Sequence, residues 1–183
     1  MGTKILVVLA DGFEEIEAVS IIDVLRRAGL EVTAAGLDKR DVTGSHGITI
    51  KTDTTLEEYK AKPDAVILPG GMPGAENLSK SIILKTLLED MQKSKKLIGA
   101  ICAAPAVALA AHGLLDGKKA TCYPGYENKF GRQIQFSTDR VVCDGNVVTS
   151  RGPGTAIEFA LEIVSVLVSK EKAEELFQTL LVK

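Results

Sequence analysis

Apolar runs of strand length alternate along the chain with segments whose apolar residues recur at helical spacing. Continuous apolar runs are typical of parallel strands covered on both faces, and helices join such strands by right-handed crossovers. The pattern predicts strands over residues 4–10, 31–36, 65–68 and 97–101, and helices over 14–28, 83–92, 152–168 and 170–180. It therefore indicates an α/β fold, a flavodoxin-like three-layer α/β/α sandwich with a mostly parallel central sheet.

The first predicted helix has a regular apolar spacing. Ile16, Val19, Ile22 and Leu25 recur along it, which predicts that these side chains form the side facing the core. Gly29 follows and is expected to end the helix as a C-terminal cap.

Shorter elements are predicted in the rest of the chain. Residues 41–50 are expected to form a small hairpin-like excursion with Ser45, His46 and Gly47 at its tip. Three further short strands are predicted over 119–122, 140–143 and 147–150. The turn at 144–146, Asp-Gly-Asn, has hairpin chemistry and joins the last two of them.

The composition is that of one globular domain spanning residues 1–183, with 45% hydrophobic and 25% charged residues. A net charge of −2 without a Lys/Arg block argues against a nucleic-acid-binding surface. No apolar run has the length of a membrane span, and the first strand begins too early for a targeting segment to be visible. Three cysteines in such a chain favour a reducing compartment, so the expected location is the cytoplasm.

Cys102 lies where a predicted strand, 97–101, turns into an Ala-rich predicted helix. This is the arrangement of a nucleophile elbow, with Cys where hydrolases place Ser. The backbone N–H groups of Ala103 and Ala104 would point at whatever Cys102 attacks, and the helix dipole is expected to lower the pKa of the thiol. The alternative is a buried cysteine with a structural role, which is common for free Cys.

Two more loops leave predicted strands at the same edge of the sheet. Gly70 and Gly71 follow one strand, and their N–H groups together with that of Ala103 could form an oxyanion pocket. Glu14 and Glu17 follow the first strand and share a helix face, so one carboxyl group could turn inward under the elbow and transfer protons. The alternative is that these acidic residues are solvated at the positive end of the helix dipole.

The two histidines narrow the chemistry. His112 precedes Gly113 at the end of the elbow helix, where a capping role is expected, and His46 lies at the tip of the predicted hairpin. A Cys-His-Asp hydrolase needs a histidine from a separate loop, and the convenient position holds Tyr123. No His/Cys cluster has zinc spacing, so the sequence predicts metal-free chemistry between a cysteine and a glutamate.

The chain resembles members of the DJ-1/ThiJ/PfpI superfamily, in its DJ-1 branch, over essentially its whole length. The matching motifs are residues 9–17, 26–29, 68–71, 100–105 and 149–155. The resemblance implies a homodimer without a cofactor, with Cys102 as an oxidation-sensitive nucleophile and Glu17 as its protonated partner. It also implies that Gly71 and Ala103 supply backbone donors, that Pro153 lines the pocket, and that Glu14 and Arg27 fall near the dimer interface.

The function implied by the resemblance is a cofactor-independent glyoxalase that converts methylglyoxal or glyoxal to lactate or glycolate, with deglycation of protein or nucleotide adducts as a related activity. Similar animal proteins carry His where Tyr123 stands, and its absence fits Glu17 as the main acid/base. Ala103 stands where the protease-like branch has His, which argues against a peptidase. The alternatives are an oxidative-stress sensor or redox-dependent chaperone acting through Cys102, and a partner-binding scaffold with an unreactive thiol.

Overall fold

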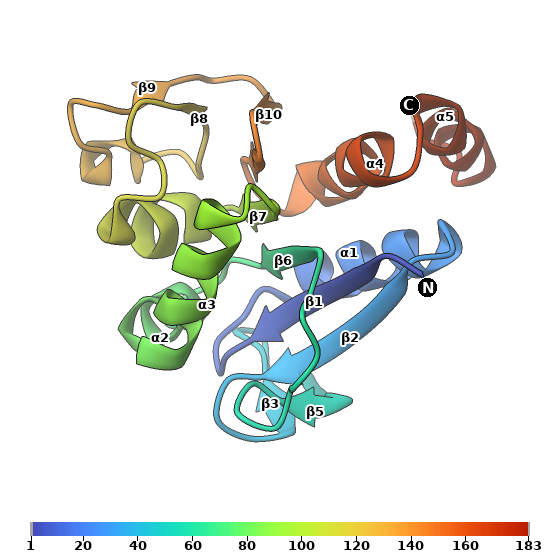
Figure 1. The fold of residues 1–183 in the computed structure, drawn as a ribbon, viewed down its shortest axis with the longest axis horizontal. Helices are drawn as coiled ribbons and strands as arrows, with labels where there is room; N and C mark the ends of the chain where they lie inside the picture. The colour runs from blue at the N-terminus through green and yellow to red at the C-terminus, as the bar shows by residue number, and fades with distance from the viewer. Residues whose placement is uncertain (1, 183) are drawn as a thin grey trace.

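A computed structural model describes residues 2–182 and is built around a seven-stranded sheet (Figure 1). Its strands are β1 (Lys4–Leu9), β2 (Glu31–Gly36), β5 (Thr54–Thr55), β6 (Ala65–Leu68), β7 (Leu97–Ile101), β10 (Val141–Asp144) and β11 (Val147–Ser150). Side chains of β6 and β7 are buried throughout, which explains why both strands are uninterrupted apolar runs in the sequence.

The strand order is β10-β11-β7-β6-β1-β2-β5. All neighbouring strands pair in parallel except β10 and β11, which form the antiparallel hairpin predicted from its turn. The order β2-β1-β6-β7-β11 is that of flavodoxin-like proteins, and the chain changes direction across the sheet between β1 and β6. Ligands of such sheets bind beyond the carboxyl ends of the strands near this point, so the fold predicts a site where β1, β6 and β7 end.

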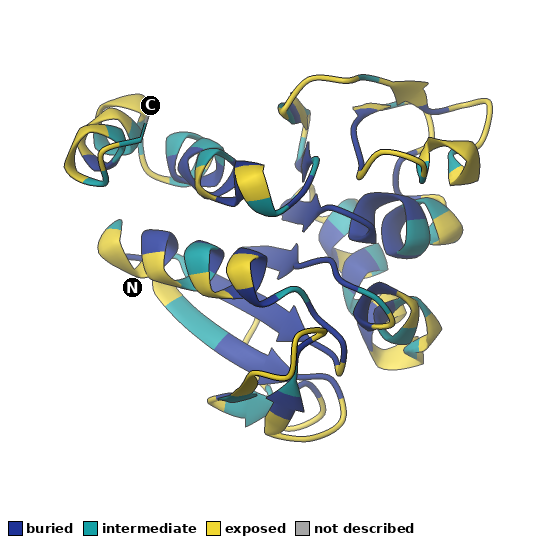
Figure 2. Ribbon diagram, turned by 180° about the vertical axis from the view of Figure 1, so that it is seen from behind, coloured by how far each residue is buried: buried dark blue, intermediate teal, exposed yellow. Residues whose placement is uncertain are grey.

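Helices cover both faces of the sheet, and the α/β sandwich is confirmed. Helices α1 (Glu15–Arg27) and α4 (Ala156–Leu167) run side by side on one face, with α5 (Lys170–Thr179) against α4 (Figure 2). Helix α3 (Ile82–Lys93) packs on β6 and β7 from the other face, next to a helix absent from the predictions, α2 (Gly74–Lys80). Because α2 is short and follows Pro73, its sequence resembles a loop.

The predicted core-facing side of α1 is confirmed at Leu25, which is fully buried, and Ile22 is partly buried against the core, but the prediction is wrong at Ile16 and Val19. The side chains that face the core are Ala18, Ile21, Val24 and Leu25, together with the carboxyl group of Glu17. Ile16 and Val19 are instead 58% and 52% exposed. The helix carries two apolar stripes, and the stripe that contains Glu17 is the buried one. Periodicity alone favoured the other stripe because it contains no charge.

Two small sheets flank the main one. Strands β3 (Asp41–Thr43) and β4 (Thr49–Lys51) form the predicted hairpin. The strand predicted at 119–122 is shorter in the structure, where β8 covers Lys119–Ala120. It pairs with β9 (Gln135–Phe136), a strand that the sequence did not indicate. Within residues 2–182, no helix combines the length and apolar character needed to cross a membrane.

Candidate active site

Cys102 occupies a sharp bend directly after β7, as the sequence predicts for a nucleophile elbow. Its backbone φ is +64°, a left-handed conformation that is strained for any residue with a side chain. Two hydrogen bonds hold this conformation: the Cys102 N–H donates to the carbonyl of Ser150 over 3.0 Å, and the Tyr123 N–H donates to the carbonyl of Cys102 over 2.8 Å. The surrounding structure therefore keeps Cys102 in a position that local preferences disfavour.

The segment after Cys102 is a π-helix over Pro105–Leu109 followed by a 3-10 turn over Ala110–His112, where the sequence predicts an ordinary helix. Two alanines lie between Cys102 and this segment, and both are buried: Ala103 is 2% exposed and Ala104 is 0% exposed. Cys102 itself is 9% exposed. Only a small part of Cys102 is therefore accessible to solvent.

Glu17 is fully buried beneath the elbow, so one of the acidic side chains of α1 does turn inward. Its Oε2 accepts a hydrogen bond from the backbone N–H of Gly70 over 2.7 Å, and its carboxyl group lies beside the Cys102 thiol. Burial raises the pKa of Glu17 to about 7, and the nearby charge of Glu14 adds to the shift. The hydrogen bond from Gly70 and the neighbouring Cys102 thiol lower the pKa and so act in the opposite direction. Near neutral pH the carboxyl group can therefore both give and take a proton.

Burial also raises the pKa of the Cys102 thiol, and a charged Glu17 raises it further. The backbone N–H groups of Gly71 and Ala103 hydrogen-bond the sulfur and favour the thiolate, but they do not reverse the shift. The predicted lowering of this pKa by the helix dipole is thus wrong, because desolvation and the adjacent carboxylate outweigh the backbone groups. Glu17 lies within hydrogen-bonding reach to accept the thiol proton.

The two glycines after β6 allow the close approach between these groups. A Cβ atom on Gly70 would lie 2.5 Å from Cβ of Cys102 and 3.0 Å from Oε2 of Glu17. Gly71 has a φ of +91°, and a Cβ there would collide with the backbone N of Glu14. The Gly70 N–H is engaged by Glu17, so Gly71 and Ala103 remain as the donors that face the sulfur, and Gly70 contributes by orienting Glu17.

Glu15 is an unpredicted buried acid beside this site. Its Oε1 accepts the backbone N–H groups of His46 over 2.7 Å and Ile48 over 3.3 Å, and its Oε2 lies 3.0 Å from Nδ1 of His46. Burial alone would raise the pKa of Glu15, but these hydrogen bonds lower it to about 2. We call the contact between Glu15 and the hairpin tip 45–47 the hairpin latch, because it fastens the hairpin to the start of α1.

The same place holds the one group of potential metal ligands found within residues 2–182. Nδ1 of His46 and carboxylate oxygens of Glu14 and Glu15 lie within 4.8 Å of one another. The His46 side chain is 70% exposed and the Glu15 side chain is 7% exposed. The contact between them is therefore accounted for as an ion pair that joins the hairpin to α1, without a metal ion. His46 accordingly points at α1 rather than at Cys102.

The other predicted residues lie around the elbow or on α1. Pro153 is in the loop that follows β11, whose last residue, Ser150, holds the Cys102 backbone. Arg27 is exposed and pairs with Asp23 of the same helix over 2.6 Å. Tyr123 is 43% exposed, and its hydrogen bond to Cys102 is the one from its backbone N–H to the Cys102 carbonyl.

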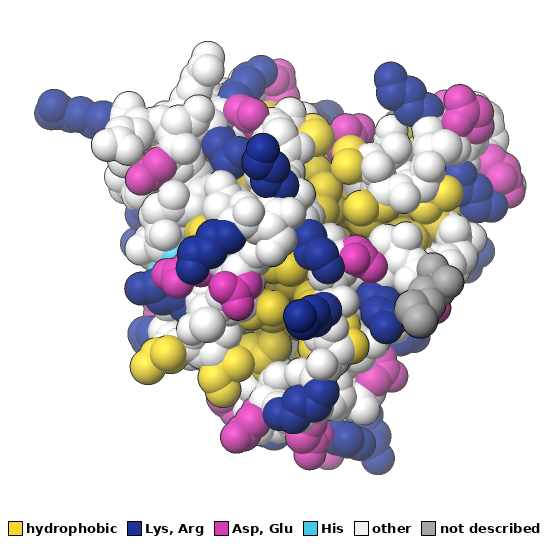
Figure 3. Space-filling model, viewed as in Figure 1, with side chains coloured by type: hydrophobic (Ala, Val, Ile, Leu, Met, Phe, Trp, Pro, Cys, Tyr) yellow, Lys and Arg dark blue, Asp and Glu magenta, His cyan; other side chains and the backbone are white. Residues whose placement is uncertain are grey.

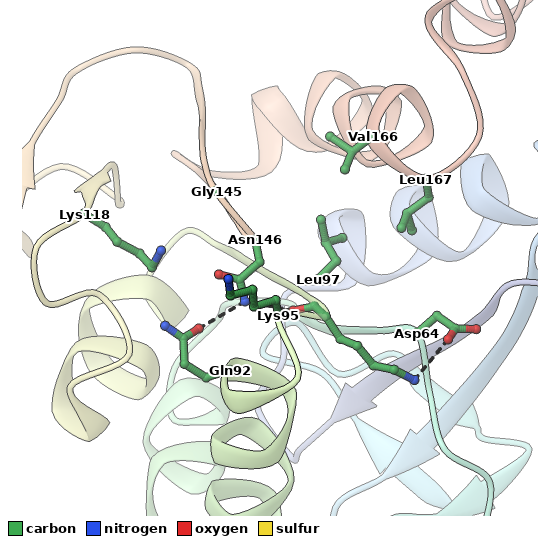
Figure 4. Close-up of a pocket in the computed structure, with 10 residues that line it drawn as sticks. Asp64, Gln92, Lys95, Leu97, Lys118, Gly145, Asn146, Val166 and Leu167 are labelled. Carbon is green, nitrogen blue, oxygen red and sulfur yellow. Dashed lines mark hydrogen bonds and ion pairs between the residues drawn. The ribbon is translucent and has the colours of Figure 1, made fainter.

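A separate hollow of about 730 Å³ lies at the opposite edge of the sheet (Figure 4). Asp64 precedes β6, Leu97 begins β7 and Asn146 precedes β11, so the hollow collects at the amino ends of the strands. Figure 3 shows hydrophobic side chains in a furrow on this side of the molecule, bordered by charged ones. Lys96 is held there by Asp64 over 3.0 Å. The hollow is therefore distinct from the site around Cys102.

A mostly parallel α/β sandwich with a cysteine at the elbow above a buried carboxyl group defines a class of flavodoxin-like proteins. The chain belongs to the DJ-1/PfpI family, which it matches over residues 3–166. The Parkinson disease protein 7 homolog of Danio rerio is 48% identical over 187 residues, which cover all of this chain and 98% of that protein.

Two further comparisons give the same assignment. The glutathione-independent glyoxalase DJR-1.2 of Caenorhabditis elegans is 41% identical over 169 residues, 91% of this chain and 89% of that protein. The crystal structure of Drosophila melanogaster DJ-1beta superposes with a TM-score of 0.95 at 45% identity, over the full length of both chains. The predicted membership of the DJ-1 family is confirmed, and the family includes glyoxalase enzymes.

Proposed function

We propose that the protein is a cofactor-independent glyoxalase that converts methylglyoxal to lactate and glyoxal to glycolate. The observation that supports this most directly is the buried Glu17 carboxyl group beside the Cys102 thiol, at an elbow with two backbone donors. The Caenorhabditis elegans relative is named a glutathione-independent glyoxalase, which supports an activity of this class. A small aldehyde suits a cysteine that is only 9% exposed.

In the first step, the sulfur of Cys102 adds to the aldehyde carbon and forms a C–S bond. The thiol proton passes to Glu17 and from there to the former carbonyl oxygen, which gives a hemithioacetal. The N–H groups of Gly71 and Ala103 stabilise the negative charge on that oxygen as it develops. A glutamate with a pKa of about 7 suits this transfer, because it accepts and returns a proton at neutral pH.

In the second step, the Glu17 carboxylate removes the proton from the carbon bonded to sulfur. The resulting enediol is protonated by Glu17 at the neighbouring carbon, which converts the adduct to a 2-hydroxy thioester. Water then hydrolyses the thioester, releasing the hydroxy acid and restoring the thiol. One carbon is oxidised while its neighbour is reduced, so no external oxidant or reductant takes part.

The test is lactate formation from methylglyoxal without glutathione or added metal, comparing the wild type with Cys102→Ser and Glu17→Gln. Both variants are expected to lose turnover by at least about 100-fold while circular dichroism stays unchanged. A wild type without turnover, or a Cys102→Ser variant that keeps it, would contradict the proposal.

Deglycation of early methylglyoxal adducts on proteins or nucleotides is a finer proposal for the same site. It requires that Cys102 act on the adduct itself and not only on aldehyde released from it. An assay that holds free methylglyoxal at a constant level separates the two. Adduct loss that then proceeds at the uncatalysed rate would reject the deglycase activity.

A second candidate function is sensing of oxidants through Cys102. The N–H groups of Gly71 and Ala103 and the Glu17 carboxyl group surround this sulfur, and they could hold the oxygens of a sulfinic acid. Mild peroxide followed by intact mass and peptide mapping should show two added oxygens on Cys102. Equal oxidation of Cys122 and Cys143 would count against both this role and a redox-dependent chaperone activity.

We also propose that the protein forms a homodimer through the outer side of α1. Ile16 and Val19 are exposed on this helix, and Ile48, also 58% exposed, is tied to the start of the helix by the bond from its N–H to Glu15. Glu14 and Arg27 mark the two ends of the same helix. An apolar surface of this kind is typical of a protein interface.

A cytoplasmic location stays a prediction from the sequence.

A further inference from the structure

Two buried hydroxyl groups lie at the carboxyl end of β11, behind the elbow. Ser150 is 0% exposed and Thr155 is 5% exposed. Their oxygens are 2.6 Å apart. Ser150 Oγ also lies 2.7 Å from the carbonyl of Arg140, and Thr155 Oγ1 lies 2.9 Å from the carbonyl of Gly152. The backbone N–H of Gly152 donates to Thr155 Oγ1 over 3.1 Å.

The two hydroxyl protons join these contacts into a single chain of hydrogen bonds. Each hydroxyl has one proton, so the three contacts to Arg140, between the hydroxyls and to Gly152 share two protons. Thr155 donates to Ser150 while Ser150 donates to Arg140, or Ser150 donates to Thr155 while Thr155 donates to Gly152. Either order uses both hydroxyl groups together, so removing one of them disturbs the bonds of the other.

Ser150 connects this chain to Cys102. Its carbonyl accepts the N–H of Cys102 over 3.0 Å, and its hydroxyl belongs to the chain just described. The other end of the chain fixes Gly152, the residue before Pro153. A guanidinium N–H of Arg140 donates to the carbonyl of Gly154 over 2.8 Å, so the loop is held on both sides of Pro153.

We propose that Ser150 and Thr155 are positioning residues that set the distance between Cys102 and the loop of residues 152–154. The loop lies next to the elbow, because a Cβ on Gly152 would lie 3.0 Å from Cδ2 of Tyr123, whose N–H bonds the Cys102 carbonyl over 2.8 Å. This inference rests on the proposed function in so far as the substrate reaches the thiol past this loop. Neither side chain touches the reacting atoms. They act through the backbone N–H of Cys102 on one side and through Gly152 on the other, and so they determine the width of the approach to the thiol.

The experiment compares Thr155→Val, which keeps the shape and removes the hydroxyl, with Thr155→Ser, which keeps the hydroxyl and removes a methyl group. The first readout is the ratio of the alkylation rates of Cys102 by iodoacetamide and by the bulkier N-ethylmaleimide. We expect Thr155→Val to change this ratio about fivefold, because a buried hydroxyl hydrogen bond is lost, and Thr155→Ser to restore the wild-type ratio. Ser150→Ala should resemble Thr155→Val, and the double variant should add little to either.

The second readout is methylglyoxal turnover, in which Thr155→Val should raise KM about fivefold and leave kcat within about twofold. The alkylation ratio does not require turnover, so it tests the positioning role even if the glyoxalase proposal fails. Equal ratios for Thr155→Val and the wild type, or the same change in Thr155→Ser as in Thr155→Val, would overturn the inference. A Thr155→Val variant that unfolds is replaced by Ser150→Ala, judged by the same ratio.

Discussion

Gly70 donates its backbone N–H to Oε2 of Glu17 over 2.7 Å, and this bond aligns the carboxyl group that meets the Cys102 thiol. The other oxygen, Oε1, is buried and has no hydrogen-bond partner among the N–H and O–H groups of residues 2–182. A buried oxygen without such a partner is costly, and its presence beside a thiol is typical of a site arranged for proton transfer. The fold supplies the alignment by bringing the ends of β6 and β7 together.

Replacing Gly70 with Ala should strongly reduce the activity of Cys102. The added Cβ would lie 2.5 Å from Cβ of Cys102, and neither atom can move without a shift of the backbone. We expect a loss of stability of about 1–3 kcal/mol and a fall in turnover and in the alkylation rate of Cys102 of at least about tenfold. Gly131→Ala is the matched control, because nothing lies within 4 Å of a Cβ there. Equal behaviour of the two variants would show that the close approach is unimportant.

The stability of the protein should decrease with rising pH because of Glu17. Its pKa is about 7 in the folded protein against 4.5 as the ordinary value. The folded state therefore binds this proton more tightly, and the associated stability is complete below about pH 4.5 and lost as the pH rises through 7. This difference between the two pKa values corresponds to roughly 3 kcal/mol in the free energy of unfolding.

The measurement is the free energy of unfolding in urea at about pH 5 and about pH 8 for the wild type and Glu17→Gln. Subtracting the two proteins cancels the titration of the other groups. As the pH rises from about 5 to about 8, Glu17→Gln should gain stability relative to the wild type, by up to roughly 3 kcal/mol. A difference that stays constant with pH would mean that Glu17 is not held in its protonated form.

The hairpin latch should stabilise the fold in the opposite pH range. The pKa of Glu15 is lowered to about 2, so its contribution is complete above about pH 4.5 and is lost as the pH falls through 2. We expect Glu15→Gln to cost about 1–2 kcal/mol at neutral pH, since charge-assisted hydrogen bonds to two backbone N–H groups weaken. The cost should shrink towards pH 2.

His46→Gln is the matched variant for the latch. It keeps the backbone N–H groups of His46 and Ile48 that bind Glu15, and removes only an exposed ring. Its loss of stability in urea unfolding at neutral pH should therefore be smaller than that of Glu15→Gln. The reverse order would show that the ring, and not the backbone, carries the latch.

The sequence predicted most of the strands and the position of the elbow because both depend on local patterns. The run at 65–68 and the end of the strand before Cys102 are confirmed to the residue. The inward turn of Glu17 was one of two alternatives, since an acid in the first helical turn is ordinarily solvated. Glu15 was missed for that reason: its partners lie on a hairpin about thirty residues away, and no local signal connects them.

The two apolar stripes of α1 give the last prediction. One stripe packs against the sheet, and the other leaves Ile16 and Val19 exposed on the surface, where a second copy of the chain would cover them. Ile16→Glu together with Val19→Glu would place charges in an apolar contact, so the dimer dissociation constant should rise by at least about 100-fold. Ile82→Glu is the control, because Ile82 is 79% exposed at the start of α3 on the opposite face of the sheet. Sedimentation equilibrium should show a dimer for the wild type and for Ile82→Glu, and a monomer for the α1 variant. A wild type that is already a monomer, or an α1 variant that stays a dimer, would place the interface elsewhere or remove it.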